Sequence, residues 1–251
     1  MNLFDLHGKV AIITGSTRGI GLAIARALQD QGAQVVISSE NADDCDRVGR
    51  EMGTLAIPAD VTDARQLEKL VHGTADHHGG IDILVCNAGI TGRPGPFATV
   101  DMDDFDQVMA INLRSQVTLC NLALPHIAAR GGGSTILISS LSSLRGNSAI
   151  NAYALAKAGV AQLARNLAVE WGPRNVRVNA ISPGFIRTEL SAPLLADAAF
   201  VQRRMAMTPL RRPGEVHEVA GAALFLASAA GAFVTGQNLV VDGGTLISDG
   251  T

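Results

Sequence analysis

The sequence contains few aromatic and few charged residues. Phe, Trp and Tyr together make up 4% of its 251 residues, and Trp171 and Tyr153 are the single representatives of their types. Charged residues make up 17% and hydrophobic residues 47%, a balance that excludes a disordered chain and allows a large buried core. The formal net charge is -3, whereas nucleic-acid-binding domains are usually basic. We therefore expect no nucleic-acid partner.

Cysteines and long apolar runs are also scarce. Cys45, Cys86 and Cys120 form no CxxC pair and are odd in number, which is typical of a reducing compartment. The longest uncharged apolar tract, at 219–234, is too short and too rich in small residues for a membrane span, and the N-terminus lacks a signal-peptide pattern. The histidines have no ligand spacing, so we expect no metal site. These features predict a cytoplasmic protein without a membrane partner.

Short apolar runs alternate with longer helical patterns along the chain. The predicted strands are 9–14, 33–38, 54–58, 82–86, 134–139, 175–181 and 237–241, and the predicted helices are 19–31, 41–52, 63–78, 103–130, 151–171 and 215–229. Most of these strands are apolar without interruption, as is typical of parallel strands covered on both faces. The alternation predicts an α/β fold: a single doubly wound, Rossmann-type domain over residues 1–251, with a seven-stranded parallel sheet and helices on both faces. The long segment before the last strand predicts a substrate-covering insertion at about 185–212.

A glycine-rich turn, TGSTRGIG (14–21), joins the first predicted strand to the first predicted helix. Such a turn binds phosphate, because free N–H groups and the helix dipole point at the anion. Its spacing is GxxxGxG rather than the standard GxGxxG, and a turn that merely needs small residues is the alternative. Glu40 lies close to the distance, about 20 residues on, at which an acid binds the adenosine ribose and favours NAD. Arg18 favours NADP, because a guanidinium suits a phosphate, so both coenzymes stay open.

Tyr153 and Lys157 stand at positions i and i+4 of a predicted helix, so their side chains share one face. A free phenol has a pKa of about 10, and a nearby ammonium group is expected to lower it toward the range that proton transfer needs. The pair alone also fits a half-buried tyrosine beside a surface lysine. Three features favour a catalytic site: Ser140 ends one strand, the turn CNAG (86–89) ends another, and the polar Asn112 interrupts an apolar helical pattern.

Together these segments resemble the classical short-chain dehydrogenase/reductase family. The resemblance extends over nearly the whole chain, through TGSTRGIG, DVTD (60–63), CNAG, YALAK (153–157), SPGFIRTEL (182–190) and VTGQNLVVDGG (234–244). It implies an NAD(P)-dependent oxidoreductase that interconverts a secondary alcohol and a ketone by hydride transfer. One departure is Cys86, which occupies a position that is commonly Asn in the family. Because Asn87 to Gly89 are intact, we expect this change to be tolerated, with thiol chemistry at Cys86 as a weak alternative.

The resemblance also implies a role for each catalytic residue. Tyr153 would be the general acid in reduction and the base in oxidation, and Lys157 would lower the tyrosine's pKa and bind the nicotinamide ribose. Ser140 would orient the substrate oxygen, and Asn112 would hold a water that links Lys157 to solvent.

Further residues follow from the same resemblance. The expected coenzyme-binding residues are Gly15, Thr17, Arg18, Gly19, Ile20, Gly21, Ser39, Glu40, Asp60, Val61, Asn87, Ala88, Gly89, Tyr153, Lys157, Pro183, Gly184, Ile186 and Thr188. The expected substrate residues are Ser140, Ser142, Asn147 and Phe185. The family suggests a homotetramer with contacts through 103–130, 151–171 and the C-terminal segment.

Two other functions are compatible with the sequence. One is a 3-oxoacyl-[acyl-carrier-protein] reductase, for which Arg130 and Arg174 are candidate contacts to an acidic carrier protein. The arginines of QRRMAMTPLRR (202–212) could instead meet an anionic substrate, although most of them are expected to be solvated. The other is a non-catalytic coenzyme-binding protein, since a fold does not fix a function. The presence of Ser140, Tyr153 and Lys157 argues against it.

Overall fold

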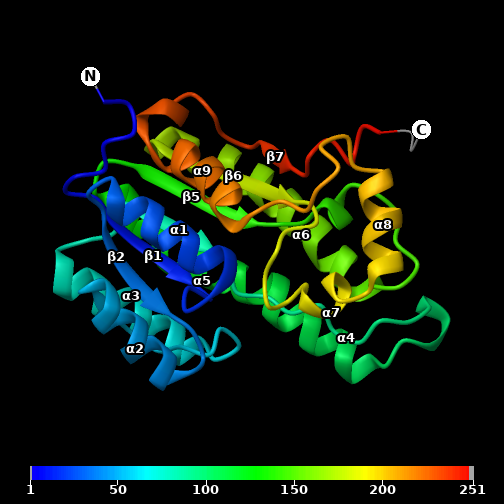
Figure 1. The fold of residues 1–251 in the computed structure, drawn as a ribbon. Helices are drawn as coiled ribbons and strands as arrows, with labels where there is room; N and C mark the ends of the chain where they lie inside the picture. The colour runs from blue at the N-terminus through cyan, green and yellow to red at the C-terminus, as the bar shows by residue number, and fades with distance from the viewer. Residues whose placement is uncertain (1, 249–251) are drawn as a thin grey trace.

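The computed structural model describes residues 2–248 and contains one parallel sheet (Figure 1). Its strand order is β3-β2-β1-β4-β5-β6-β7. The strands are β1 (Val10–Thr14), β2 (Gln34–Ser38), β3 (Leu55–Ala56), β4 (Ile83–Cys86), β5 (Gly133–Ile138), β6 (Val176–Pro183) and β7 (Asn238–Val241). The predicted seven-stranded doubly wound sheet is therefore confirmed, although β3 is shorter than the apolar run at 54–58 indicates.

Helices cover both faces of the sheet. One core cluster joins it to α1 (Gly19–Asp30), α2 (Ala42–Met52) and α9 (Val216–Ala227), and a second joins its other face to α3 (Ala64–His78), α5 (Ser115–Ala129) and α6 (Asn151–Trp171). Every residue of β1 is buried, which explains why this strand is uniformly apolar up to Thr14. Short 3₁₀ turns occupy Phe97–Thr99, Leu141–Ser143, Gly172–Arg174 and Ala229–Gly231.

The predicted helix at 103–130 is divided into three parts. It consists of α4 (Met102–Met109), a π-helical turn at Ala110–Arg114 and α5. Asn112 lies in the π turn, with 0% of its surface exposed. A wider turn of this kind re-aims side chains and is frequent at functional sites. The sequence led us to expect one continuous helix over 103–130, so this turn was not foreseen.

The segment between β6 and α9 contains two short helices, α7 (Ala192–Leu195) and α8 (Ala198–Ala206). They fall inside the insertion predicted at 185–212, and Figure 1 shows α8 standing clear of the sheet. No helix among residues 2–248 is long and apolar enough to cross a membrane.

Asp82 connects three strands at the amino edge of the sheet. Its carboxylate, 2% exposed, accepts a hydrogen bond from the backbone N–H of Val10 at 3.0 Å. It also forms ion pairs with Lys9 Nζ at 3.3 Å and with Arg130 Nη2 at 3.2 Å. The side chain thus links the starts of β1 and β4 to the residues before β5.

We predict that Asp82→Ala lowers the free energy of unfolding by about 1–3 kcal/mol, because it leaves the buried N–H of Val10 without its acceptor. Urea unfolding followed by far-UV circular dichroism measures this loss. Asp76→Ala, at an exposed position of α3, is the matched control and should change stability by less than about 0.5 kcal/mol. Equal stabilities of the two variants would contradict the role of Asp82.

Candidate active site

The glycine-rich turn forms an anion cradle at the end of β1. Gly15 and Gly19 have positive φ angles of 61° and 55°, which glycine adopts most readily. A Cβ on Gly21 would lie 2.2 Å from the carbonyl oxygen of Gly15, so no larger residue fits there without moving the turn. The side chain of the N-cap residue Arg18 forms no capping hydrogen bond, and the first turn of α1 contains no acid. The free N–H groups of this turn are thus available to a phosphate.

Asn87 connects this turn to the end of β4. Its side-chain amide donates to the carbonyl oxygens of Thr14 and Gly15, both at 3.0 Å, and its backbone N–H donates to Thr14 Oγ1 at 3.1 Å. β1 and β4 are neighbours at the point where the strand order reverses, which is where doubly wound sheets bind ligands.

A pocket of about 800 Å³ opens above these two strand ends. It is lined by the following expected coenzyme-binding residues: Gly15, Thr17, Arg18, Gly19, Ile20, Ser39, Glu40, Asp60, Val61, Asn87, Ala88, Gly89 and Thr188. The sequence did not point to Asn41, Asp44, Ala59, Ile90, Ile111, Glu189 and Leu190, which also line it. The glycine cradle and the pocket's position fit a dinucleotide whose pyrophosphate lies at the start of α1.

A second pocket of about 430 Å³ adjoins the first, and the two share Ile20, Asn87, Gly89, Thr188 and Leu190. The second is lined by Tyr153, Lys157, Pro183, Gly184 and Ile186 of the expected coenzyme-binding set, and by all four expected substrate residues: Ser140, Ser142, Asn147 and Phe185. Gly21 and Asn112 line neither pocket. Gly21 instead shapes the turn beneath the first pocket.

Ser140 and Tyr153 interact within the second pocket. Ser140 follows β5 and caps a 3₁₀ turn, its Oγ accepting the N–H of Ser142 at 3.1 Å. Tyr153 lies in the first turn of α6, and its interaction with Ser140 favours the phenolate. Burial is the larger effect, and it raises the pKa of Tyr153 above its ordinary value. The sequence led us to expect a lowered pKa; that expectation was wrong for the protein's own groups because desolvation outweighs the effect of Ser140.

Lys157 is buried beneath the tyrosine. Only 3% of the surface of Lys157 is exposed, and its Nζ lies 5.6 Å from the centroid of the Tyr153 ring. Nζ donates to the carbonyl oxygen of Ile138 at 2.8 Å. Burial lowers the pKa of Lys157 from 10.5 to about 8, while the charge interaction with Cys86 acts in the opposite direction. The ammonium group is thus hydrogen-bonded to the backbone at the end of β5 rather than to the phenol of Tyr153.

Cys86 lies close enough to Lys157 for their charges to interact. A hydrogen bond with Cys120 and burial nevertheless raise the pKa of the Cys86 thiol well above its usual value. Reactive cysteines have lowered pKa values and solvent access, and Cys86 has neither. Its thiol is therefore a packing group, and its proximity to Lys157 was not apparent from the sequence.

Asn112 is bound to the backbone of Ile90 through both ends of its amide. Its Nδ2 donates to the carbonyl oxygen at 2.7 Å, and its Oδ1 accepts the N–H at 2.9 Å. A Cβ on Gly89 would lie 2.7 Å from Asn112 Oδ1 and 3.4 Å from Lys157 Nζ. The π turn thus brings the amide against the strand-end turn, next to Lys157.

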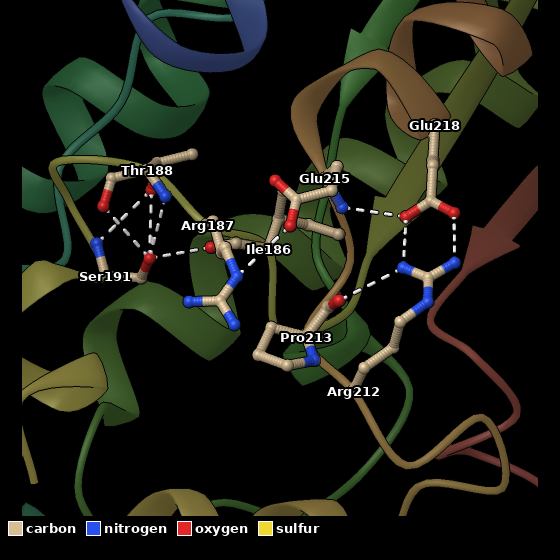
Figure 2. Close-up of polar contacts among 8 residues, drawn as sticks. All are labelled: Ile186, Arg187, Thr188, Ser191, Arg212, Pro213, Glu215 and Glu218. Atoms are coloured by element: carbon tan, nitrogen blue, oxygen red, sulfur yellow. Dashed lines mark hydrogen bonds and ion pairs between the residues drawn. The ribbon is translucent and has the colours of Figure 1, made fainter.

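Two groups of polar contacts hold the ends of the 185–212 segment together (Figure 2). At its start, Ser191 Oγ donates to the carbonyl oxygen of Ile186 at 2.6 Å and accepts the N–H of Thr188 at 3.0 Å. Beside it, Arg187 Nε lies 3.1 Å from Glu215 Oε1. The backbone N–H of Arg187 also donates to the carbonyl oxygen of Gly214 at 2.9 Å, which closes the base of the segment.

Arg212 and Glu218 form the second group (Figure 2). The guanidinium meets the carboxylate through two hydrogen bonds of 2.8 and 2.5 Å, and the N–H of Glu215 donates to the same carboxylate at 2.7 Å. The hydrogen bond from Arg212 is the main cause that lowers the pKa of Glu218 to about 2, so this pair stays charged at physiological pH. The end of the segment is thereby tied to the first turn of α9.

The arginines considered for carrier-protein binding lie away from the pockets. Arg130 precedes β5, and its guanidinium donates to Asp82 Oδ2 at 3.2 Å and to the carbonyl oxygen of Gly8 at 3.3 Å. Arg174 precedes β6 and lies over the Trp171 ring, 4.6 Å from its centroid. Both arginines therefore lie at the amino edge of the sheet, whereas Ser140 lies at its carboxyl edge.

Comparison with known proteins gives consistent matches. The sequence model of a family described as Enoyl-(Acyl carrier protein) reductase matches residues 15–245. Cis-4-hydroxycyclohexanecarboxylate dehydrogenase of Sinomonas cyclohexanicum is 41% identical over 94% of this chain and 96% of its own. Dehydrogenase/reductase SDR family member 4 of Sus scrofa is 36% identical over 96% of this chain and 88% of its own.

A solved structure shows the same fold. A gluconate 5-dehydrogenase from Burkholderia cenocepacia J2315, in complex with NADP and tartrate, is 38% identical, with a TM-score of 0.93 and 98% of each chain covered. With the pockets at the carboxyl edge and the ordered motifs along the sequence, these matches mean that the chain belongs to the short-chain dehydrogenase/reductase family.

Proposed function

We propose that this protein interconverts a secondary alcohol and a ketone where its two pockets meet, with NAD(P) as the hydride carrier. One observation carries the proposal. Ser140 and Tyr153 both line the smaller pocket, where Ser140 acts to lower the pKa of Tyr153, and that pocket adjoins the one above the glycine cradle. A substrate oxygen held by both hydroxyls would thus lie beside the coenzyme.

The chemistry needs one hydride and one proton. The nicotinamide, when bound, supplies the hydride to a carbonyl carbon or takes it from an alcohol carbon. In reduction, Tyr153 donates its hydroxyl proton to the substrate oxygen as the C–H bond forms, and in oxidation it takes that proton back while the C–H electron pair leaves. A phenol whose pKa is raised keeps its proton at neutral pH, which suits the acid role. Ser140 stabilises the charge that develops on the same oxygen.

Lys157 and Asn112 would support this proton transfer without contacting the substrate. Lys157, buried beside the nicotinamide end of the pocket, would bind the ribose hydroxyls and stabilise the phenolate that forms after proton donation. Asn112 lies against Gly89 near Lys157, and it would hold a water that links the lysine to solvent. The 185–212 segment, closed at its base, would cover the substrate within the same single domain.

We predict that Tyr153→Phe reduces kcat by about two to four orders of magnitude, because it removes one hydroxyl and hence the acid or base. Coenzyme affinity should stay close to that of the wild type, since the ring and Lys157 are retained. Steady-state assays over a ketone panel measure the first effect, and reduced-coenzyme fluorescence measures the second. Near-normal turnover would reject the assignment, and a wild type that binds coenzyme but consumes no carbonyl would favour the non-catalytic alternative.

The pH dependence should reflect Lys157, whose pKa of about 8 lies within the working range. Only the ammonium form donates all of its hydrogen bonds, so kcat/KM for the reduced coenzyme should fall as pH rises through about 8. Lys157→Gln should have a lower kcat/KM and lack this inflection, whereas Lys69→Gln, at an exposed position, should retain it. An unchanged inflection in Lys157→Gln would assign it to another group.

We further propose that NAD(H) is preferred over NADP(H). Four carboxylates line the larger pocket, against the single guanidinium of Arg18: Glu40, Asp44, Asp60 and Glu189. Glu40 lies two residues after the end of β2 and Asp44 near the start of α2. Asp44 is paired with Arg47 at 3.0 Å, whereas Glu40 forms no ion pair within residues 2–248 and so opposes a 2′-phosphate most directly. A carboxylate here suits ribose hydroxyls instead.

Glu40→Arg should shift the ratio of kcat/KM for NADH over NADPH toward NADPH by about tenfold or more, because a guanidinium attracts the phosphate that the carboxylate repels. Parallel kinetics with both coenzymes measure the ratio. Glu68→Arg makes the same charge change on exposed α3 and should leave the ratio unaltered. A wild type that already prefers NADPH would contradict the proposal.

We also propose that the protein forms a homotetramer and is located in the cytoplasm. Apolar side chains are exposed on α5 and α6 and toward the C-terminus: Val117 (37%), Leu155 (49%), Val169 (81%), Phe233 (104%) and Ile247 (87%). Such surfaces are typical of contacts between subunits. All three cysteines are free, in keeping with a reducing compartment.

A further inference from the structure

The smaller pocket carries an excess of positive charge that the catalytic steps do not use. Arg145, Lys157 and Arg204 line it, and none of its lining residues is an acid. Lys157 belongs to the catalytic group, but Arg145 lies in the loop after the Leu141–Ser143 turn and Arg204 in α8. We call Arg145 and Arg204 the arginine pair.

The arginine pair has no counterion. Neither guanidinium forms an ion pair or a hydrogen bond within residues 2–248, and Arg204 Nε is buried without any partner. Burial and the like charge of Arg145 lower the pKa of Arg204 to about 10. Buried donors are normally paired, so two neighbouring guanidiniums without acceptors are suited to an anion that enters the pocket.

Asp242 is the acid whose charge acts on Arg204, and its effect is smaller than that of burial or of Arg145. Its two oxygens are already bound by the C-terminal backbone. Oδ1 accepts the N–H of Gly244 at 2.8 Å and Oδ2 accepts the N–H of Leu246 at 2.6 Å. Asp242 therefore does not replace the missing acceptor.

The remaining wall is largely apolar. Leu141, Ile150, Phe185, Leu190, Leu194 and Phe200 line it, and the rings of Phe185 and Phe200 meet edge to face at 5.6 Å. Several polar lining groups are committed to the protein itself. Asn147 Oδ1 accepts the N–H groups of Ala149 and Ile150, and Ser191 Oγ donates to the carbonyl oxygen of Ile186. The wall therefore offers little to a substrate with many hydroxyls.

We propose that the substrate is a hydroxy or oxo acid whose carboxylate binds the arginine pair, while an apolar ring or alkyl body separates that carboxylate from the reacting carbon. The proposal rests on the proposed dehydrogenase function and adds the substrate class. A carboxylate matches the forked donors of a guanidinium, and the aromatic and aliphatic wall matches the body between the two polar ends.

The test compares 4-oxocyclohexanecarboxylate with its neutral methyl ester and with 5-ketogluconate, a polyhydroxylated acid. The wild type should reduce the acid with a kcat/KM about tenfold or more above that of the ester, and also above that of 5-ketogluconate. Arg204→Gln and Arg145→Gln should each lower kcat/KM for the acid by about 10- to 100-fold through KM and leave that for the ester nearly unchanged. The unchanged ester reaction shows that each variant is folded and catalytically intact.

Arg203→Gln is the matched control. Arg203 precedes Arg204 in the same helix, is exposed and does not line the pocket. It should keep the acid-to-ester ratio of the wild type. An unaltered ratio in both arginine-pair variants would overturn the carboxylate site, and faster reduction of 5-ketogluconate than of 4-oxocyclohexanecarboxylate would overturn the apolar body.

Binding separates this inference from the proposed function. Calorimetric titration with cyclohexanecarboxylate, which cannot react, should show binding to the wild type that Arg204→Gln weakens by about tenfold or more, and cyclohexanecarboxamide should bind weakly to both. If no ketone is reduced but this pattern holds, the proposed function fails while the anion site stands. If ketones are reduced but cyclohexanecarboxylate binds both proteins equally, the anion site fails alone.

Discussion

The burial of the Lys157 ammonium is the constraint around which the site is organised. Removing a charged group from water is costly unless hydrogen bonds replace its hydration. Here the carbonyl oxygen of Ile138 at the end of β5 supplies one acceptor, and burial still lowers the pKa of the lysine to about 8. A group with that pKa is poised to gain or lose a proton near neutrality, which a relay requires and an exposed lysine would not provide.

The parallel sheet places the partners of this lysine without contributing chemistry of its own. The ends of β1, β4 and β5 meet at one edge, and each continues into a turn of small or polar residues. The amide of Asn87 joins the first two turns, while Asn112 joins the second to the π turn. Since the strands beneath are fully packed, these turns have a rigid base. The pocket wall built by the 185–212 segment is the part that can vary between relatives without disturbing that base.

The features that could be predicted are those whose residues lie close together in the sequence or belong to one ordered set of motifs. The strands, the glycine turn and the four proposed catalytic positions follow from local patterns and an ordered resemblance, and Ser140, Tyr153 and Lys157 line one pocket. The direction of the pKa shift of Tyr153 did not follow, because the sequence reveals the neighbouring lysine but not the depth of burial. Arg145 and Arg204 line the same pocket from segments far apart in the sequence, so only the possibility of an anionic substrate for the 202–212 arginines could be foreseen. The proximity of Cys86, Cys120 and Lys157 likewise joins three separate elements.

The π turn at Ala110–Arg114 has a consequence for the spacing of the chain. A π turn contains one residue more than an α-helical turn, so it offsets α4 from the phase of α5 by about 100°. Deleting any single residue there would restore a continuous α-helix and rotate the two halves against each other. Val108, now fully buried, would then swing away from its packing partners, or the sheet-facing side of α5 would turn outward. The number of residues in this stretch is therefore constrained as well as the identity of Asn112.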